Sequence, residues 1–178
     1  MDFLHSLTNS GLAYVHSPSE KRGVYLSNII GFIVTVLCII LVVCYYFWYG
    51  LSIVTVFIGI IALLSLLPVL LNKFGFVLTG RIWMSLFLPV LVTSVSLYSK
   101  SLYYDRQEEL DYFTFRFVIL GSCIFPLILF SLKEKKLLIL CSLIGLGILM
   151  AHDPLHHYFG VGYRNSKANK RAKNKQFL

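Results

Sequence analysis

A cluster of histidines follows a long apolar run near the C-terminal end of the chain. The stretch "AHDPLHHYFGVGY" spans residues 151–163 and holds three of the chain's five histidines: His152, His156 and His157. Imidazole nitrogens bind zinc and copper, and they change charge near neutral pH because the unperturbed pKa of histidine is about 6.5. These residue types are compatible with a metal site, a proton-sensing site or a plain polar loop.

The number of histidines excludes one class of enzyme. The spacing H-x-x-x-H-H resembles the histidine boxes of membrane desaturases and hydroxylases, but those enzymes hold a pair of irons with imidazoles from several boxes, and five histidines cannot supply them. A single zinc or copper ion held by His152, His156 and His157, with Asp153 as a further ligand, stays open. Because Pro154 disfavours helical geometry at the residue before it, we expect a turn at Asp153.

A second group of charged residues precedes and enters the fourth apolar run. Glu108, Glu109 and Asp111 come before this run or at its start, and Arg116 lies inside it. An ionisable residue within a membrane span is a functional candidate, because a charge in hydrocarbon is costly. Arg116 is also close enough to the surface to reach water, so a structural pair with Asp111 or a glutamate is the alternative. We predict a ligand-binding site formed by these four residues and Asp153.

The composition indicates a membrane protein. Of 178 residues, 57% are hydrophobic and 13% charged, with a mean hydropathy of +0.77, whereas soluble domains are about a quarter charged. About 20 apolar residues cross the hydrocarbon core as a helix. We therefore expect an all-α integral membrane protein, an antiparallel bundle of five transmembrane helices of which the last is short. The apolar runs are Leu26–Tyr49, Leu51–Leu71, Ile82–Tyr98, Tyr112–Leu132 and Leu137–Ala151.

Charges in the connections predict the orientation. With a cytoplasmic N-terminus, the outer connections hold only Lys100 and Arg106 as basic residues before the tail. By the positive-inside rule this favours an N-terminus in the cytoplasm. The expected organisation is a leader at 1–25, a bundle at 26–151, an extracytoplasmic histidine-rich loop at 152–163 and a basic tail at 164–178. The basic residues of the inner connections are Lys21, Arg22, Lys73, Arg81, Lys133, Lys135 and Lys136.

The basic tail does not follow this rule. With five spans it would lie outside, although it holds six of the sixteen basic residues. Either the short fifth run does not cross the membrane, or "QFL" begins a sixth span of a longer protein, and we favour the second explanation. A basic tail beside a membrane is typical of contact with anionic lipid or of topology signals, so we expect the lipid bilayer and not nucleic acid as a partner.

Other features are mostly structural. Pro68, Pro89 and Pro126 lie in the second, third and fourth runs and should kink those helices. No catalytic signature is present, and the four cysteines lie in apolar runs without CxxC spacing, so we expect free buried thiols.

Apart from Arg116 the runs are nearly free of ionisable residues, which disfavours a small transporter or channel subunit. A membrane-embedded metal-dependent enzyme is a further alternative.

Several segments together resemble a class of bacterial sensors. They are "SPSEKRGVYLSNIIG", "LLSLLPVLLNKFGFVLTGR", the acidic connection and "HDPLHHYFGVGY". Over residues 17–163 the chain resembles the N-terminal multi-helix region of the membrane-associated sensor (MASE-type) class, found in Bacteroidota fused to class III adenylyl or guanylyl cyclases or to histidine kinases. The resemblance implies a dimeric receptor of the inner membrane that relays a ligand, metal or proton signal to a cytoplasmic output domain. The chain departs from this class in lacking a clear sixth span and any cyclase or kinase sequence.

Overall fold

The structure is a computed structural model that describes residues 2–102 and 109–161. Within these residues the chain forms helices and no strand. The elements in chain order are α1 (Asp2–Thr8), η1 (Leu12–Tyr14), α2 (Pro18–Tyr49), α3 (Ile53–Ser65), α4 (Leu67–Lys73), α5 (Val77–Leu102), α6 (Glu109–Ser122), α7 (Phe125–Leu129), η3 (Leu132–Glu134) and α8 (Lys135–Tyr158).

Four helical stretches are long and apolar enough to cross a membrane. The all-helical class is therefore confirmed and these helices are compatible with a membrane protein, while the five-helix antiparallel bundle stays a prediction. The stretch Phe113–Leu129, which covers most of α6 and α7, is apolar but shorter than the other four. The last apolar run, Leu137–Ala151, was expected to form a short helix. This expectation is wrong, because α8 extends beyond the run at both ends, from Lys135 to Tyr158. The four stretches are Pro18–Trp48, Ile53–Lys73, Val77–Ser101 and Leu132–Tyr158.

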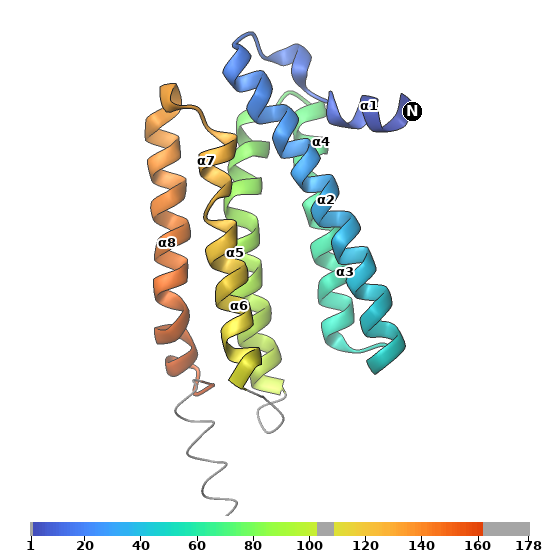
Figure 1. The fold of residues 1–178 in the computed structure, drawn as a ribbon, viewed down its shortest axis with the longest axis vertical. Coiled ribbons are helices and arrows are strands. Elements are labelled where there is room, and N and C mark those ends of the chain that lie inside the picture. Colours follow the sequence, from blue (N-terminus) through green and yellow to red (C-terminus); the bar gives the residue numbers. More distant parts are fainter. Residues whose placement is uncertain (1, 103–108, 162–178) are drawn as a thin grey trace, which may run out of the picture.

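The long helices lie side by side with alternating directions (Figure 1). α2 leads away from the N-terminus, α3 and α4 return beside it, and α5 leads away again. The α6–α7 segment and α8 complete the molecule beside α5. We call the end that carries the beginnings of α2, α5 and α8 the N-terminal end, and the end where these helices stop the distal end.

Proline divides two of the apolar stretches. Pro68 stands in the first turn of α4 and Pro126 in the first turn of α7. The missing N–H of proline costs little at these positions, since the first N–H groups of a helix have no partner within the helix. Pro89 and Pro154 instead lie inside α5 and α8.

The expected turn at Asp153 is wrong, because α8 continues through Pro154 to Tyr158. The helix ends where Gly160 adopts a left-handed conformation with φ 72°. The Val161 N–H bonds the carbonyl of His156 and the Gly160 N–H bonds that of His157, at 2.9 and 3.1 Å, which is a Schellman motif. The final turns are stabilised by this cap and by the hydrogen bonds of His152 and His156 to Ser96 on α5. The first residues of the predicted 152–163 loop are therefore helical.

α2 and α3 approach each other closely through small side chains. A Cβ atom built on Gly31 would lie only 2.6 Å from the carbonyl oxygen of Ser65. One turn further along α2, the Thr35 hydroxyl lies 2.6 Å from that of Ser65. Small residues with interhelical hydrogen bonds are a common means of joining helices in membranes, where no hydrophobic force drives them together.

Two asparagines attach the N-terminal segment to the bundle. The Asn28 amide on α2 donates to the carbonyls of Thr8 and Ser10 at 3.0 and 2.9 Å. Its oxygen accepts from the Asn72 amide of α4 at 2.7 Å. Both asparagine side chains are fully buried, so their polar groups need these partners. The network attaches the N-terminal segment to α2 and α4, and Figure 1 shows α1 at this end of the molecule.

The Asn28→Ala variant should loosen this segment without unfolding the bundle. It removes two hydrogen bonds to the backbone of the segment, each worth roughly 1 kcal/mol. The free energy of local opening of residues 2–15 should therefore fall by about 1–2 kcal/mol. Hydrogen–deuterium exchange measures this difference by peptide. Ser94→Ala is the control, because the Ser94 hydroxyl is exposed and bonds only within its own helix. Equal exchange of residues 2–15 in Asn28→Ala and the wild type would contradict the assignment.

Candidate functional site

A buried polar cluster lies near the distal end, where α5 packs against α8. Ser96 and Lys100 stand one turn apart on α5, and His152 and His156 stand one turn apart on α8. Residues four apart share a helix face, so each helix directs two polar side chains to the same interface. All four residues are at most 1% exposed. We call these four residues the distal cluster.

Ser96 connects the two histidines. Its hydroxyl oxygen lies 3.0 Å from Nε2 of His156 and 3.4 Å from Nε2 of His152. The imidazole rings themselves are 4.0 Å apart between centroids. Nδ1 of His156 lies 2.6 Å from the backbone carbonyl of His152. A carbonyl only accepts, so this nitrogen carries a proton.

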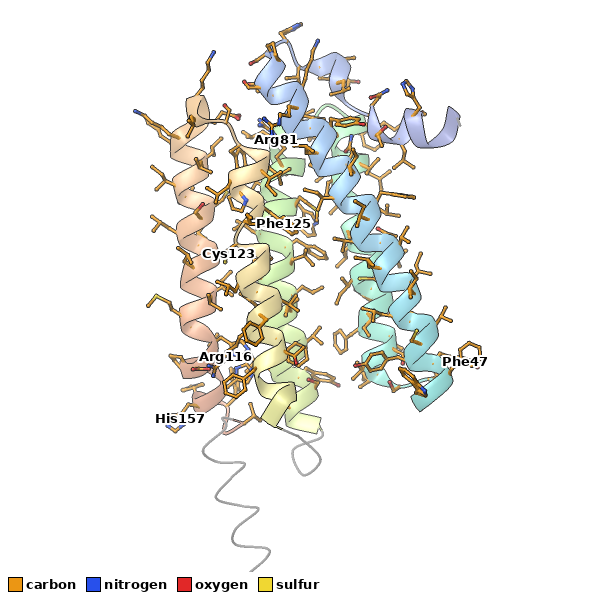
Figure 2. The ribbon with its side chains drawn as sticks, viewed as in Figure 1. Phe47, Arg81, Arg116, Cys123, Phe125 and His157 are labelled. Carbon is orange, nitrogen blue, oxygen red and sulfur yellow. The ribbon has the colours of Figure 1, made fainter. Side chains whose placement is uncertain are left out.

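Arg116 joins α6 to the distal cluster through Asp153. The guanidinium forms an ion pair with Oδ1 of Asp153 on α8, and Arg116 lies at the distal end in Figure 2. The same carboxylate oxygen is 3.5 Å from Nδ1 of His152. One carboxylate thus lies between a permanent cation and a buried imidazole. The partner that the structure describes comes from another helix. Pairing with Asp111 or a glutamate of the preceding connection stays a prediction, because those side chains are not among the described ones.

The structure separates the three histidines predicted as metal ligands. His152 and His156 face α5, but His157 is exposed on α8 (Figure 2). Within residues 2–102 and 109–161, no three or more His, Cys, Asp and Glu side chains are grouped so that they could hold a metal ion. A zinc or copper site stays a prediction, with only two of its three histidines on one face.

The acidic residues before α6 are placed only in part. Glu109 and Asp111 belong to the first turn of α6. Glu108 lies outside the described residues. Of the five residues predicted to bind a ligand, the structure brings Arg116 and Asp153 into contact.

Sequence analysis missed two buried basic residues on α5. It placed Lys100 and Arg81 in connections, but both lie within the helix and are 1% and 3% exposed. The Lys100 Nζ atom lies 5.8 Å above the ring of Phe115. The expectation that the spans contain almost no ionisable residue apart from Arg116 is therefore wrong, and it no longer counts against a transporter. The spacing of Lys100 four residues after Ser96 could have indicated that Lys100 continues the polar face of the same helix.

A second buried polar contact lies at the N-terminal end. Arg81 makes two hydrogen bonds to the Glu134 carboxylate, at 3.0 and 2.8 Å. It also stacks 5.2 Å from the Phe130 ring. Glu134 forms a capping box with Ser131 just before α8 begins. The Arg81–Glu134 pair therefore attaches the beginning of α5 to the beginning of α8, and Figure 2 shows Arg81 at this end.

No protein-family model, curated protein or solved structure matches this chain. The resemblance to membrane-associated sensors therefore stays a prediction from the sequence. Two polar contacts join α5 to the α8 region, the distal cluster and the Arg81–Glu134 pair.

The ion pair of Arg116 should contribute little to folding. Arg116 and Asp153 are 29% and 53% exposed, and exposed pairs are worth less than about 1 kcal/mol. Asp153→Asn should therefore change the free energy of unfolding by less than about 1 kcal/mol, measured by denaturant titration in detergent micelles. His157→Ala, on the same helix and exposed, provides the matched control. A loss of several kcal/mol in Asp153→Asn alone would show that the pair is structural.

Proposed function

We propose that this chain is the membrane part of a receptor whose signal binds at the distal cluster. The observation that carries the proposal is the burial of Lys100, His152 and His156 around Ser96 within apolar helices. Intramembrane ionisable residues are expensive and are usually functional. The Arg116–Asp153 pair links this cluster to α6, so a change in its charge acts on three helices at once.

Two shared contacts suggest how the signal would travel. α5 and α8 meet at the distal cluster and again at the Arg81–Glu134 pair. A change in packing at one end of two stiff helices alters their relative position at the other end. The receptor would exist in two packings, and its signal would favour one of them. Movement of α8 against α5 would then reach the N-terminal end.

The charge distribution supports an N-terminus in the cytoplasm. Six basic side chains are exposed at the N-terminal end, and such residues are enriched on the cytoplasmic side of membranes. In this proposal α6 and α7 form a fifth crossing in a bacterial inner membrane. The resemblance adds a homodimer that acts on a cyclase or kinase output domain. The six residues are Lys21, Arg22, Lys73, Lys133, Lys135 and Lys136.

A distance measurement at the N-terminal end tests the receptor. Spin labels would be attached at positions 73 and 136, which are exposed on α4 and α8, after the native cysteines are replaced. Distances would be measured in lipid nanodiscs by pulsed electron paramagnetic resonance. The probes are a change from neutral to mildly acidic pH, zinc ion and acetate.

The receptor proposal predicts a shifted distance distribution with at least one probe. The shift should disappear in a His152→Ala/His156→Ala variant and persist in His157→Ala, whose side chain is outside the cluster. An unchanged distribution under all three probes would overturn the proposal. A shift that survives the double variant would also contradict it, because the signal would then bind elsewhere.

A carrier for protons or small anions is the second candidate. It is favoured by the buried cations near both ends of α5, Arg81 and Lys100, because transport paths are lined by such residues. Proton flux into liposomes loaded with a pH-sensitive dye separates the candidates. A receptor should leave the flux at the level of protein-free liposomes, whereas a carrier should raise it in a manner that depends on His152.

A further inference from the structure

Donors and acceptors in the distal cluster determine which nitrogen of His156 carries the proton and favour one nitrogen of His152. Nδ1 of His156 must donate, because its partner is the backbone carbonyl of His152. While His156 is neutral, its Nε2 can only accept, so the Ser96 hydroxyl donates to it. The Ser96 oxygen is then available to accept from Nε2 of His152. This arrangement, which uses both contacts of the Ser96 oxygen, gives the two histidines opposite tautomers.

This assignment leaves the second nitrogen of His152 facing an acid. With its proton on Nε2, His152 presents the lone pair of Nδ1 to Oδ1 of Asp153, 3.5 Å away. A lone pair beside a carboxylate oxygen is repulsive. A proton added at Nδ1 converts the same contact into an attraction between opposite charges, and an opposite charge within about 4–6 Å favours the charged form of a group.

His156 is a poorer site for the same proton. Both of its nitrogens already have partners, and protonating Nε2 would require the Ser96 hydroxyl to turn away. The described charged groups around the pair are Lys100 on α5, Arg116 on α6 and Asp153 on α8. Asp153 contacts His152 directly and therefore favours a positive charge there.

We propose that His152 is the proton-binding residue of this receptor, which makes the proton its signal. On acidification a proton from a hydronium ion of the solvent bonds to Nδ1 of His152 and leaves water behind, and the imidazolium then pairs with the Asp153 carboxylate. The imidazolium then competes with Arg116 for one carboxylate oxygen, which weakens the attachment of α6 to α8. This inference rests on the proposed receptor function and adds the identity of its signal.

Nitrogen NMR of the imidazoles in nanodiscs tests the assignment directly. The ¹⁵N shifts distinguish the two neutral tautomers from the cation, and single His→Ala variants assign each signal. We expect Nδ1–H for His156 and Nε2–H for His152 at neutral pH, and His152 should become cationic first on acidification. The same tautomer for both residues, or His156 titrating first, would overturn the proposal.

Two variants sharpen the test. In Asp153→Asn the midpoint of the His152 titration should move to lower pH by about one unit, because an opposite charge within about 4–6 Å shifts a group by one unit or more. In His157→Ala the midpoint should stay where it is. An unchanged midpoint in Asp153→Asn would contradict the role given to the carboxylate. The tautomers of both residues, read in the same samples, report whether the cluster is still folded.

Failure of this inference can be distinguished from failure of the receptor proposal. If His152 titrates as expected but the distance between labels at 73 and 136 never changes, the proton site stands and the receptor does not. If zinc ion or acetate shifts that distance while His152 stays neutral on acidification, the receptor stands and the proton is not its signal.

Discussion

Replacing Glu134 with alanine should destabilise the protein by about 3–5 kcal/mol, the usual cost of leaving a buried charge without its partner. Arg81 is 3% exposed and both of its terminal nitrogens bond to the Glu134 carboxylate. After the substitution, the Leu129 carbonyl at 3.5 Å is a weak remaining acceptor. The free energy of unfolding, measured by denaturant titration in mixed micelles, gives the effect.

The double variant Arg81→Met/Glu134→Leu distinguishes an unpaired charge from lost packing. It removes both charges and keeps apolar volume, so most of the stability should return. Glu20→Ala is the matched single substitution, because Glu20 is a partly buried acid at the same end with no ion pair among those the structure describes. It should cost less than about 1 kcal/mol. A Glu134→Ala protein as stable as the wild type would contradict the structural role of the pair.

Gly31→Ala should separate α2 from α3 and cost about 2–4 kcal/mol. Its Cβ would meet the Ser65 carbonyl at 2.6 Å, and overpacking of this kind costs about 1–3 kcal/mol. The shift would also stretch the Thr35–Ser65 hydrogen bond, which is worth roughly 1 kcal/mol. Denaturant titration in micelles measures the loss.

Gly59 provides the control for this prediction. A Cβ at Gly59 meets nothing within 4 Å, and alanine is the better helix former by up to about 1 kcal/mol. Gly59→Ala should therefore be neutral or slightly stabilising. If both glycine variants lose the same stability, close helix contact at Gly31 is not the cause.

The membrane class and the position of most helices could be predicted from the sequence. Hydropathy depends on the residues of one segment and not on its neighbours, so a run such as Leu51–Leu71 indicates a membrane helix by itself. The ends of the helices could not be predicted in this way. The apolar runs exclude the charged residues and histidines at their ends, but Arg81, Lys100 and His152 continue their helices because partners outside their own helices bury them.

The candidate site was predicted in its residue types more than in its geometry. Arg116, Asp153, His152 and His156 were all selected from the sequence, since ionisable side chains beside apolar runs are conspicuous. Their pairing across α6 and α8 was not predicted, because nothing local relates residues 37 positions apart. Ser96 was not selected, since an isolated serine in a membrane helix is common and becomes informative only beside the histidines.

The sequence by itself determined that this chain consists of long apolar helices with histidines and acids near their ends. The tertiary structure alone decided which of these polar groups meet. In the tertiary structure α8 continues past Pro154, and His152 and His156 therefore face Ser96 while His157 does not. The reason is that local propensity follows neighbouring residues, whereas the burial of a polar group depends on whether another helix offers it a partner.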